Sequence, residues 1–276
     1  YRQQGRHASS DSLHRAALAM WTETTGPASV EVGRGHLGLS LVLIAEGRYD
    51  EARPHLRQAH DLFRRHLEPP HPDLASAVFH LGFLAHDVQN VDEAEAYYRE
   101  ALAMRQALHG DVHPDVANTL NSLGVLLGRD RNDLSGADSL FRQVLAVRRQ
   151  IYGEEHPAVA NSLNNVASLA MEREAFEEAE GLYDTLVPMV RRTLGTRHPA
   201  MVVVTTNQAR TYYEQVKLDA AIDAFNASVS YAEGLGPTHP QLASTQIEFA
   251  GVLLEADDPT RAERLAREAV SIQAET

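Results

Sequence analysis

The stretch that decides the fold is Gly110-Asp-Val-His113-Pro114-Asp-Val-Ala-Asn118-Thr-Leu-Asn121-Ser-Leu-Gly124. Its His-Pro dipeptide recurs at even steps of 42, 43, 42 and 41 residues, at His71-Pro72, His113-Pro114, His156-Pro157, His198-Pro199 and His239-Pro240. A glycine stands three residues before four of these histidines. Glycine suits the left-handed conformation that ends a helix, and proline suits the first turn of the next one. Each copy therefore predicts a helix end followed by a helix start.

Small residues recur at two further positions of the same frame. The first lies eleven residues after each histidine, at Gly82, Gly124, Ala167, Ala209 and Ala250. The second is an alanine twelve or thirteen residues later, at Ala94, Ala137, Ala179, Ala221 and Ala262. Small side chains let two helix axes approach closely, and a large neighbour then fills the space beside them. We expect the residue four positions after the alanine to be that neighbour, as Tyr98, Phe141, Tyr183 and Phe225, with Ala266 in the last repeat.

This frame predicts an all-α chain built from antiparallel helix pairs. The expected units are a truncated half repeat at 1–28 and repeats at 29–70, 71–112, 113–155, 156–197, 198–238 and 239–276. The 43-residue step places one extra residue in the turn between Gly128 and Gly136, and we interpret it as a tolerated insertion because its acidic residues lack the spacing of a calcium loop. The ends of the array predict a fragment of a longer chain.

Composition excludes several classes of function. The formal charge of −13 opposes binding to nucleic acid, and the absence of cysteine excludes disulfide scaffolds and thiol chemistry. The longest apolar runs are too short to cross a membrane. The His-Pro histidines lie one repeat apart, too far to share a metal ion. We expect no cofactor, no metal and no membrane contact, and a cytoplasmic location.

The residues Leu81-Gly82, Ala94, Tyr98 and Ala101, echoed by Leu123-Gly124, Ala137 and Phe141, resemble the tetratricopeptide repeat. The 42-residue period, the His-Pro start and the asparagine-rich first helices are similar to the kinesin light chain type of that repeat. The resemblance implies a right-handed α-solenoid, a superhelix whose first helices line a concave groove that accepts an extended peptide or a partner helix. A single lysine, Lys217, among many arginines indicates a bacterial source.

The resemblance places one face of each first helix in that groove. On this face, or beside it, lie the candidate binding residues Asn118, Asn121, Asn161, Asn164, Asn165, Asn207, Phe79, Phe83, Arg210 and Tyr213. Asparagine offers both a donor and an acceptor, so a row of amides can pair with the main chain of a peptide. Two alternatives stay open. The amides can merely cap or solvate the groove, and Phe79 and Phe83 can pack between repeats instead of forming pockets for a ligand.

No phosphate loop, nucleophile elbow or zinc-protease motif is present, so we expect no enzyme activity. The leading hypothesis is an adaptor or scaffold that binds a protein or peptide ligand. A second hypothesis is a regulatory or oligomerisation segment of a larger enzyme, such as a bacterial Ser/Thr protein kinase or a caspase-like protease. A third is self-association through the ends of the array.

Overall fold

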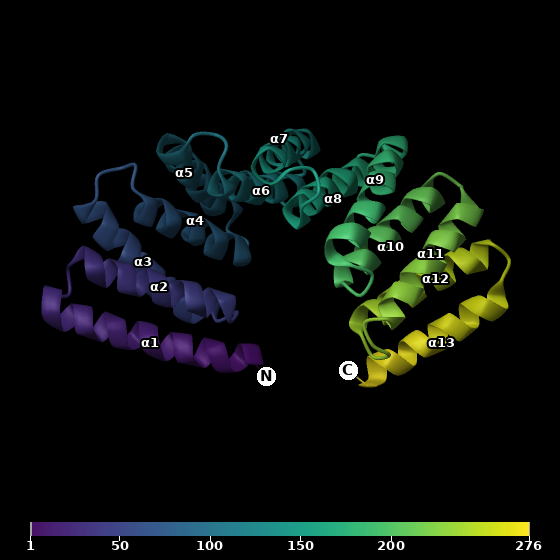
Figure 1. The fold of residues 1–276 in the computed structure, drawn as a ribbon, viewed down its shortest axis with the longest axis horizontal. Helices are drawn as coiled ribbons and strands as arrows, with labels where there is room; N and C mark the ends of the chain where they lie inside the picture. The colour runs from purple at the N-terminus through teal and green to yellow at the C-terminus, as the bar shows by residue number, and fades with distance from the viewer. Residues whose placement is uncertain (1, 276) are drawn as a thin grey trace. The chain divides into compact units, whose positions relative to one another are not determined.

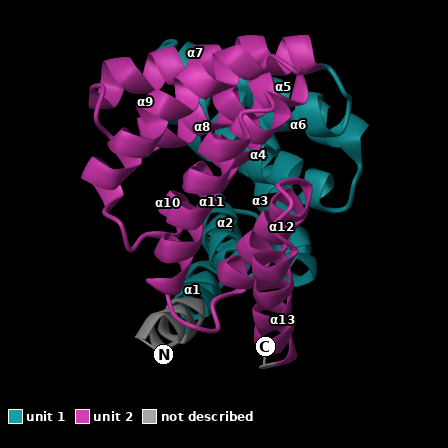
Figure 2. Cartoon of the chain, turned by 90° about the vertical axis from the view of Figure 1, so that its right-hand side faces the viewer, with its two compact units in different colours: residues 1–133 teal, residues 134–276 magenta. Residues whose placement is uncertain are grey.

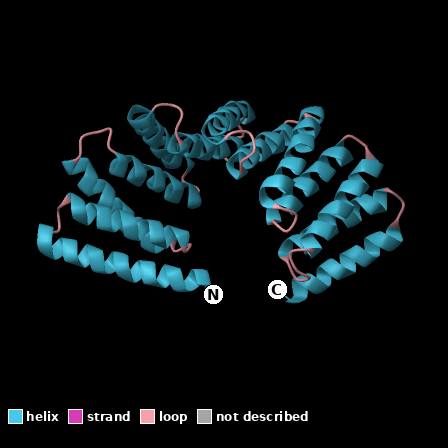
Figure 3. Ribbon diagram, in the orientation of Figure 1, coloured by secondary structure: helices cyan, strands magenta, loops and turns pink. Residues whose placement is uncertain are grey.

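The computed structural model describes the backbone of residues 2–275 and the side chains of residues 12–274, and the regular elements in this range are all α-helices (Figures 1 and 3). In chain order they are α1 (Arg2–Thr25), α2 (Val30–Ala45), α3 (Tyr49–His66), α4 (Pro72–Asp87), α5 (Val91–His109), α6 (Pro114–Arg129), α7 (Leu134–Tyr152), α8 (Pro157–Glu172), α9 (Phe176–Leu194), α10 (Pro199–Glu214), α11 (Leu218–Glu233), α12 (Pro240–Glu255) and α13 (Pro259–Glu275).

The chain divides into two compact units, which Figure 2 shows in different colours: unit 1 is residues 1–133 and unit 2 is residues 134–276. In unit 1 each helix from α1 to α6 packs against the next, and in unit 2 the same holds from α7 to α13. Below, the even-numbered helices are the first helices of the pairs and the odd-numbered ones from α3 onward are the second. The division falls in the turn that carries the extra residue.

Helix starts follow the His-Pro pattern, because each of the five histidines is an N-cap and each proline occupies the first turn. The histidine Nδ1 accepts a hydrogen bond from the backbone N–H two residues later, over 3.1–3.2 Å in all five cases. This is the role that Ser, Thr, Asp or Asn more often fills at an N-cap. Ser29 fills it for α2, where its Oγ accepts from the N–H of Val32. The predicted helix starts are confirmed.

Helices α5 and α9 end at the predicted glycines Gly110 and Gly195, whereas α11 is capped by Gly234, with φ −62°, two residues before the predicted Gly236. Gly110 caps α5 with φ 73° and ψ −178°, and Gly195 caps α9 with φ 82° and ψ 168°. Positive φ combined with extended ψ is a region that essentially only glycine populates. Glycine is therefore required at these positions for a sharper reason than the ordinary left-handed cap that the sequence indicates.

Close helix packing explains the small residues. A Cβ atom added at Gly82 would lie 2.9 Å from the Cδ1 atom of Tyr98, so α4 and α5 approach as closely as they do only because Gly82 has no side chain. Tyr98 is 1% exposed, and its counterparts Tyr183 and Phe225 are likewise buried. Tyr98 thus fills the space beside Gly82, as predicted.

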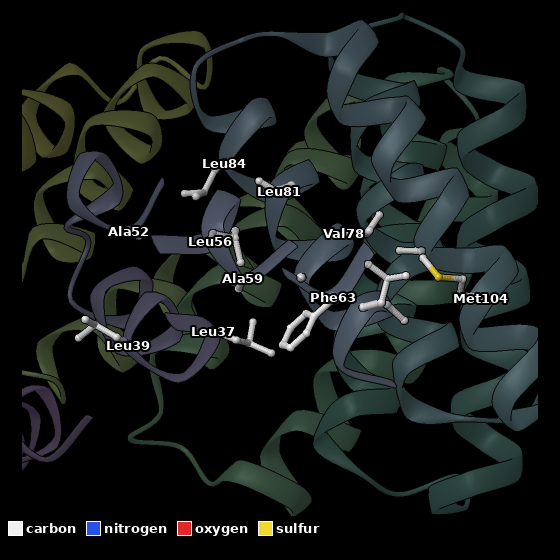
Figure 4. Packing of buried hydrophobic residues seen from close by; sticks show 14 of the residues in the cluster. Leu37, Leu39, Ala52, Leu56, Ala59, Phe63, Val78, Leu81, Leu84 and Met104 are labelled. Atoms are coloured by element: carbon white, nitrogen blue, oxygen red, sulfur yellow. The ribbon is translucent and has the colours of Figure 1, made fainter. Parts of the chain in front are cut away.

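The core of unit 1 is a cluster of apolar side chains between its helices (Figure 4). Leu56 and Phe63 of α3 meet Val78 and Leu81 of α4 there, and Met104 of α5 joins the same cluster. Burial of such side chains contributes roughly 1.5–3 kcal/mol each, which is the main source of stability for helices this short. Among the described residues, none of the helices combines the length and apolar character that a membrane span requires.

Candidate peptide groove

The structure places the candidate residues on the first helices of both units. In unit 1, Phe79 and Phe83 lie on α4, and Asn118 and Asn121 lie on α6. In unit 2, the remaining residues lie on α8 and α10; they are Asn161, Asn164, Asn165, Asn207, Arg210 and Tyr213. The amide row predicted from the sequence is thus shared between two units, and each half is described by itself below.

The two phenylalanines of unit 1 lie among other aromatic and cationic groups. The ring centroids of Phe79 and Tyr98 are 5.6 Å apart. The guanidinium carbon of Arg105 lies 4.2 Å from the centroid of the Phe79 ring, above its face. Phe83 meets Tyr49 edge to face at 5.5 Å. Both phenylalanines are half-buried and border the hydrophobic core of unit 1. These contacts are those of side chains that pack between helices.

Arg105 is a buried cation that the sequence analysis did not single out. Its side chain is 7% exposed, and its Nη1 donates to the backbone oxygen of Asp115 and to the hydroxyl of Thr119 on α6. Burial lowers the pKa of Arg105, and the nearby Asp115 carboxylate opposes that shift. The residue thus ties the second helix α5 to the first helix α6.

The amides of α8 differ in exposure. Asn161 is exposed, while Asn164 and Asn165 are half-buried. The Oδ1 atom of Asn164 is enclosed and has no hydrogen-bond partner. A buried carbonyl oxygen without a donor costs roughly 1–3 kcal/mol, so it favours any rearrangement that brings an N–H to it. On α6, Asn118 is exposed and Asn121 is half-buried.

A shallow hollow of about 200 Å³ lies between the first helices α10 and α12 of unit 2. Asn207 and Arg210 line it from α10, together with Val203 and Thr206, and Gln241, Ser244 and Glu248 line it from α12. Val203 is 39% exposed, and Ile247 and Leu254, farther along α12, are 46% and 60% exposed. This face of unit 2 therefore combines an open hollow, hydrogen-bonding side chains and exposed apolar ones.

The charges beside this hollow are paired within the protein. The guanidinium of Arg210 binds the Glu248 carboxylate through two contacts, Nε–Oε2 at 2.6 Å and Nη2–Oε1 at 2.5 Å. The Glu248 carboxylate raises the pKa of Arg210. The hydroxyl of Tyr213 donates to Glu255 over 2.5 Å, and this bond raises the pKa of Tyr213. Both contacts connect α10 to α12.

Glu248 and Glu255 are the residues that the sequence analysis missed at this face. They stand two residues before and five residues after the small residue Ala250, outside the four positions per helix taken to face the groove. The available signal was charge, because these two acidic residues lie on α12, the next first helix after the one that carries Arg210 and Tyr213. A wider face of the helix would have included them.

One cluster in unit 1 has the composition of a metal site. Single side-chain atoms of His109, His113 and Asp115 lie within 4.8 Å of one another. However, Nδ1 of His113 is the N-cap acceptor of α6, and its ring stacks on that of His109 at 4.0 Å. Stacked rings direct their lone pairs along parallel planes rather than toward one ion. Tyr152 stacks on His156 in the same way at 4.4 Å, so we interpret the cluster as a stacked helix cap.

Comparison with solved structures supports the same architecture. The chain is similar to a kinesin light chain with nearly identical TPR-like repeats from Podosopora anserina, with 22% identity, a TM-score of 0.66, and coverage of 76% of this chain and 98% of that one. BtubC (BKLC) from P. vanneervenii gives 21% identity, a TM-score of 0.62, and coverage of 95% and 91%. The quorum sensor NprR from B. thuringiensis gives 14% identity, a TM-score of 0.70, and coverage of 88% and 65%.

No curated protein is similar enough to this chain to count as a relative. At these identities the solved structures establish the fold alone. The family model for the tetratricopeptide repeat matches residues 1–65, 73–150 and 158–233, which is well over half of the chain. The chain belongs to the tetratricopeptide repeat family.

Proposed function

We propose that this chain binds an extended peptide or a partner helix through side chains of its first helices, and so acts as an adaptor or scaffold. Tetratricopeptide repeats are in general interaction modules without catalytic activity, and the family model that matches this chain is of that kind. The observation that carries the proposal is the hollow between α10 and α12, because residues expected from the sequence to contact a ligand, Asn207 and Arg210, line it.

Main-chain recognition is the first component of the proposed binding mode. Asn118, Asn121, Asn161 and Asn164 repeat at the same two positions of successive first helices, α6 and α8. Asparagine is a mediocre helix former, so its repetition within helices has a cost that a ligand contact explains. The unpartnered Oδ1 of Asn164 gains most from a ligand, because a peptide N–H would satisfy a buried acceptor.

Apolar anchoring is the second component. Val203, Ile247 and Leu254 are exposed on α10 and α12, whereas the charges of Arg210 and Glu248 neutralise each other. A ligand side chain that reaches this face therefore meets apolar surface and a neutral ion pair. We expect aliphatic or aromatic anchors in the ligand and a weak dependence of affinity on salt.

A peptide-display selection tests the proposal. The wild-type chain, an Asn121→Ala/Asn164→Ala variant and an Asn226→Ala control are used in parallel, and the enriched peptides are measured by fluorescence anisotropy. Asn226 is an exposed asparagine on the second helix α11, so its loss controls for the change of residue type. Loss of two or more hydrogen bonds should weaken binding about tenfold or more in the double variant and leave the control unchanged.

Circular dichroism of the three proteins checks that helical content is retained. Equal affinity of all three for the selected peptides would contradict recognition by amides. An Ile247→Asp variant then separates the two components, because it places a charge on the apolar part of α12 without changing any asparagine. Retention of affinity in that variant would contradict apolar anchoring.

A further inference from the structure

A second hollow in unit 2 lies away from the proposed groove. It has a volume of about 560 Å³, within the range of pockets that bind small groups, and is formed by the end of α11, the loop before α12, and the helices α12 and α13. Leu242 and Ile272 supply apolar lining, and Glu233 and Glu268 supply carboxylates. It shares no lining residue with the hollow between α10 and α12.

Gln246 is the unusual residue of this hollow. It lies seven residues after the N-cap histidine of its repeat, a position held elsewhere by Val78, Leu120, Leu163 and Thr205. A glutamine thus replaces an apolar or smaller residue at a core position, where its side chain is only 3% exposed. Buried polar groups are almost always hydrogen-bonded, so each atom of this amide needs a partner.

Only one end of the Gln246 amide has a partner. Its Nε2 donates to Oε2 of Glu268 on α13 over 2.9 Å, while Oε1 is buried without a hydrogen-bond partner. A carboxylate can only accept, so the amide nitrogen must face Glu268 and the carbonyl oxygen must point elsewhere. The orientation of the amide is therefore fixed by chemistry, and the residue lining the hollow has an unused acceptor.

One helix pair earlier in the chain, two side chains occupy the position equivalent to this hollow. There Nη2 of Arg191, on α9, donates to the hydroxyl of Tyr231, on α11, over 2.9 Å. Arg191 lies twelve residues after Ala179, and the residue twelve after Ala221 is Glu233. Tyr231 lies ten residues after Ala221, and the residue ten after Ala262 is Ile272. At the hollow, an acid thus replaces the guanidinium and a smaller aliphatic side chain replaces the phenol.

We propose that this hollow binds an arginine side chain of a partner protein. A guanidinium carries five N–H donors and a permanent positive charge, which matches two carboxylates and one unused carbonyl oxygen. Its aliphatic stem can lie along Leu242 and Ile272. The lining residues include no arginine, lysine or histidine, so these residues supply no cation of their own. The partner's arginine occupies the region that Arg191 and Tyr231 fill one helix pair earlier.

The test is an NMR titration of the isotopically labelled chain with N-acetyl-arginine-methylamide and, separately, with its citrulline analogue. Citrulline has nearly the same shape but no charge, so it controls for non-specific contacts. The arginine compound should shift the Gln246 side-chain amide and backbone signals of α13, with an affinity about tenfold or more above that of citrulline, since charge-assisted hydrogen bonds are lost in the analogue. Shifts of equal size with both compounds would overturn the proposal.

Variants locate the site. Gln246→Leu introduces the residue found at Leu120 and Leu163, so the fold is retained, and the response to arginine should disappear. Glu233→Gln should weaken binding, whereas Glu263→Gln, which removes one negative charge from α13 outside the hollow, should leave it unchanged. An unaltered response in the Gln246→Leu variant would show that arginine binds elsewhere and would overturn the proposal. The groove variants of the preceding section should respond like the wild type, so failure of one proposal leaves the other intact.

Discussion

Both units bury hydroxyl groups within the same repeat frame, but unit 1 adds a buried cation and a pair of half-buried imidazoles. The Nδ1 atoms of His36 and His55 lie 2.9 Å apart between α2 and α3, and Arg105 is almost completely enclosed. In unit 2, the hydroxyl of Thr206 lies 2.6 Å from that of Ser228 between α10 and α11. Imidazoles can change charge near neutral pH and hydroxyls cannot. One repeat pattern can therefore give two units with different responses to acid.

The glycines of the first helices also have different surroundings in the two units. Gly82 of α4 lies directly against Tyr98, while Gly251 of α12 has open space where a side chain would lie. Ala266 stands in the last repeat where Tyr98 stands in the second. A glycine in one unit is thus needed for packing, and a glycine in the other only lowers helix propensity. The following predictions test these two contrasts.

The largest effect is expected at the two glycines. Gly82→Ala should destabilise unit 1 by about 1–3 kcal/mol, because the new Cβ would lie 2.9 Å from a buried tyrosine ring. Gly251→Ala should stabilise unit 2 by about 0.5–1 kcal/mol, because alanine is the better helix former and meets no neighbour there. Hydrogen exchange of α4–α5 and of α12–α13 measures each unit separately. If both substitutions changed the stability of their units in the same direction, the predicted difference between the two glycines would be contradicted.

Acid sensitivity is expected in unit 1. Burial and the neighbouring His55 lower the pKa of His36 to about 4. The unfolded chain then binds more protons than the folded one between pH 6.5 and 4. The stability that neutral His36 contributes is therefore fully present above pH 6.5 and declines as the pH falls toward 4. Because His36 is half-exposed, solvent screening reduces the loss to about 1–2 kcal/mol.

Hydrogen exchange of α2–α3 at pH 7.5 and 5.0, corrected for the intrinsic exchange rate, measures this loss. His36→Gln should flatten the dependence, since a glutamine carries no charge at either pH. Thr206→Val in unit 2 serves as the control and should leave the dependence of α2–α3 unchanged. A wild-type unit 1 equally protected at both pH values would contradict the assignment.

Helix caps should behave alike in both units. His113→Ala in unit 1 and His156→Ala in unit 2 each remove a side-chain acceptor from the first turn of a helix, and each should cost about 1 kcal/mol. Replacement by asparagine should recover most of the loss, because its side-chain oxygen can accept from the same N–H. Urea denaturation followed by exchange in α6 and α8 provides the measurement. A loss in only one unit would mean that ring stacking, rather than the cap, dominates there.

Local signals made most of the fold predictable from the sequence. The His-Pro pairs predicted the helix starts, because an N-cap and a first-turn proline act within three residues. Gly82 and Tyr98 predicted the close packing of α4 against α5. The division after Asp133 was not predicted, because it depends on how contacts are distributed over the whole chain.

The candidate site was less predictable than the fold. The resemblance to the repeat family, combined with helical periodicity, singled out Asn207 and Arg210, and both line the same hollow. Glu248 was missed because it pairs with a residue 38 positions away, and sequence spacing on one helix does not reveal partners on another. Gln246 was missed because a single polar residue at a core position has no periodic signal. Its meaning depends on burial and on which atoms lack partners.

The smallest effect is expected from ion pairs that join neighbouring first helices. Arg34–Asp73 joins α2 to α4 in unit 1 through one contact of 2.7 Å, and Arg210–Glu248 joins α10 to α12 in unit 2 through two. All four side chains are substantially exposed, so double-mutant cycles should give coupling energies of about 0.2–0.5 kcal/mol for the first pair and about 0.5–1 kcal/mol for the second. High salt should reduce both. A coupling above about 2 kcal/mol for Arg210–Glu248 would mean that the pair holds the two helices together. A small coupling would instead leave it the role proposed above, the neutralisation of charge beside a hollow that receives apolar ligand side chains.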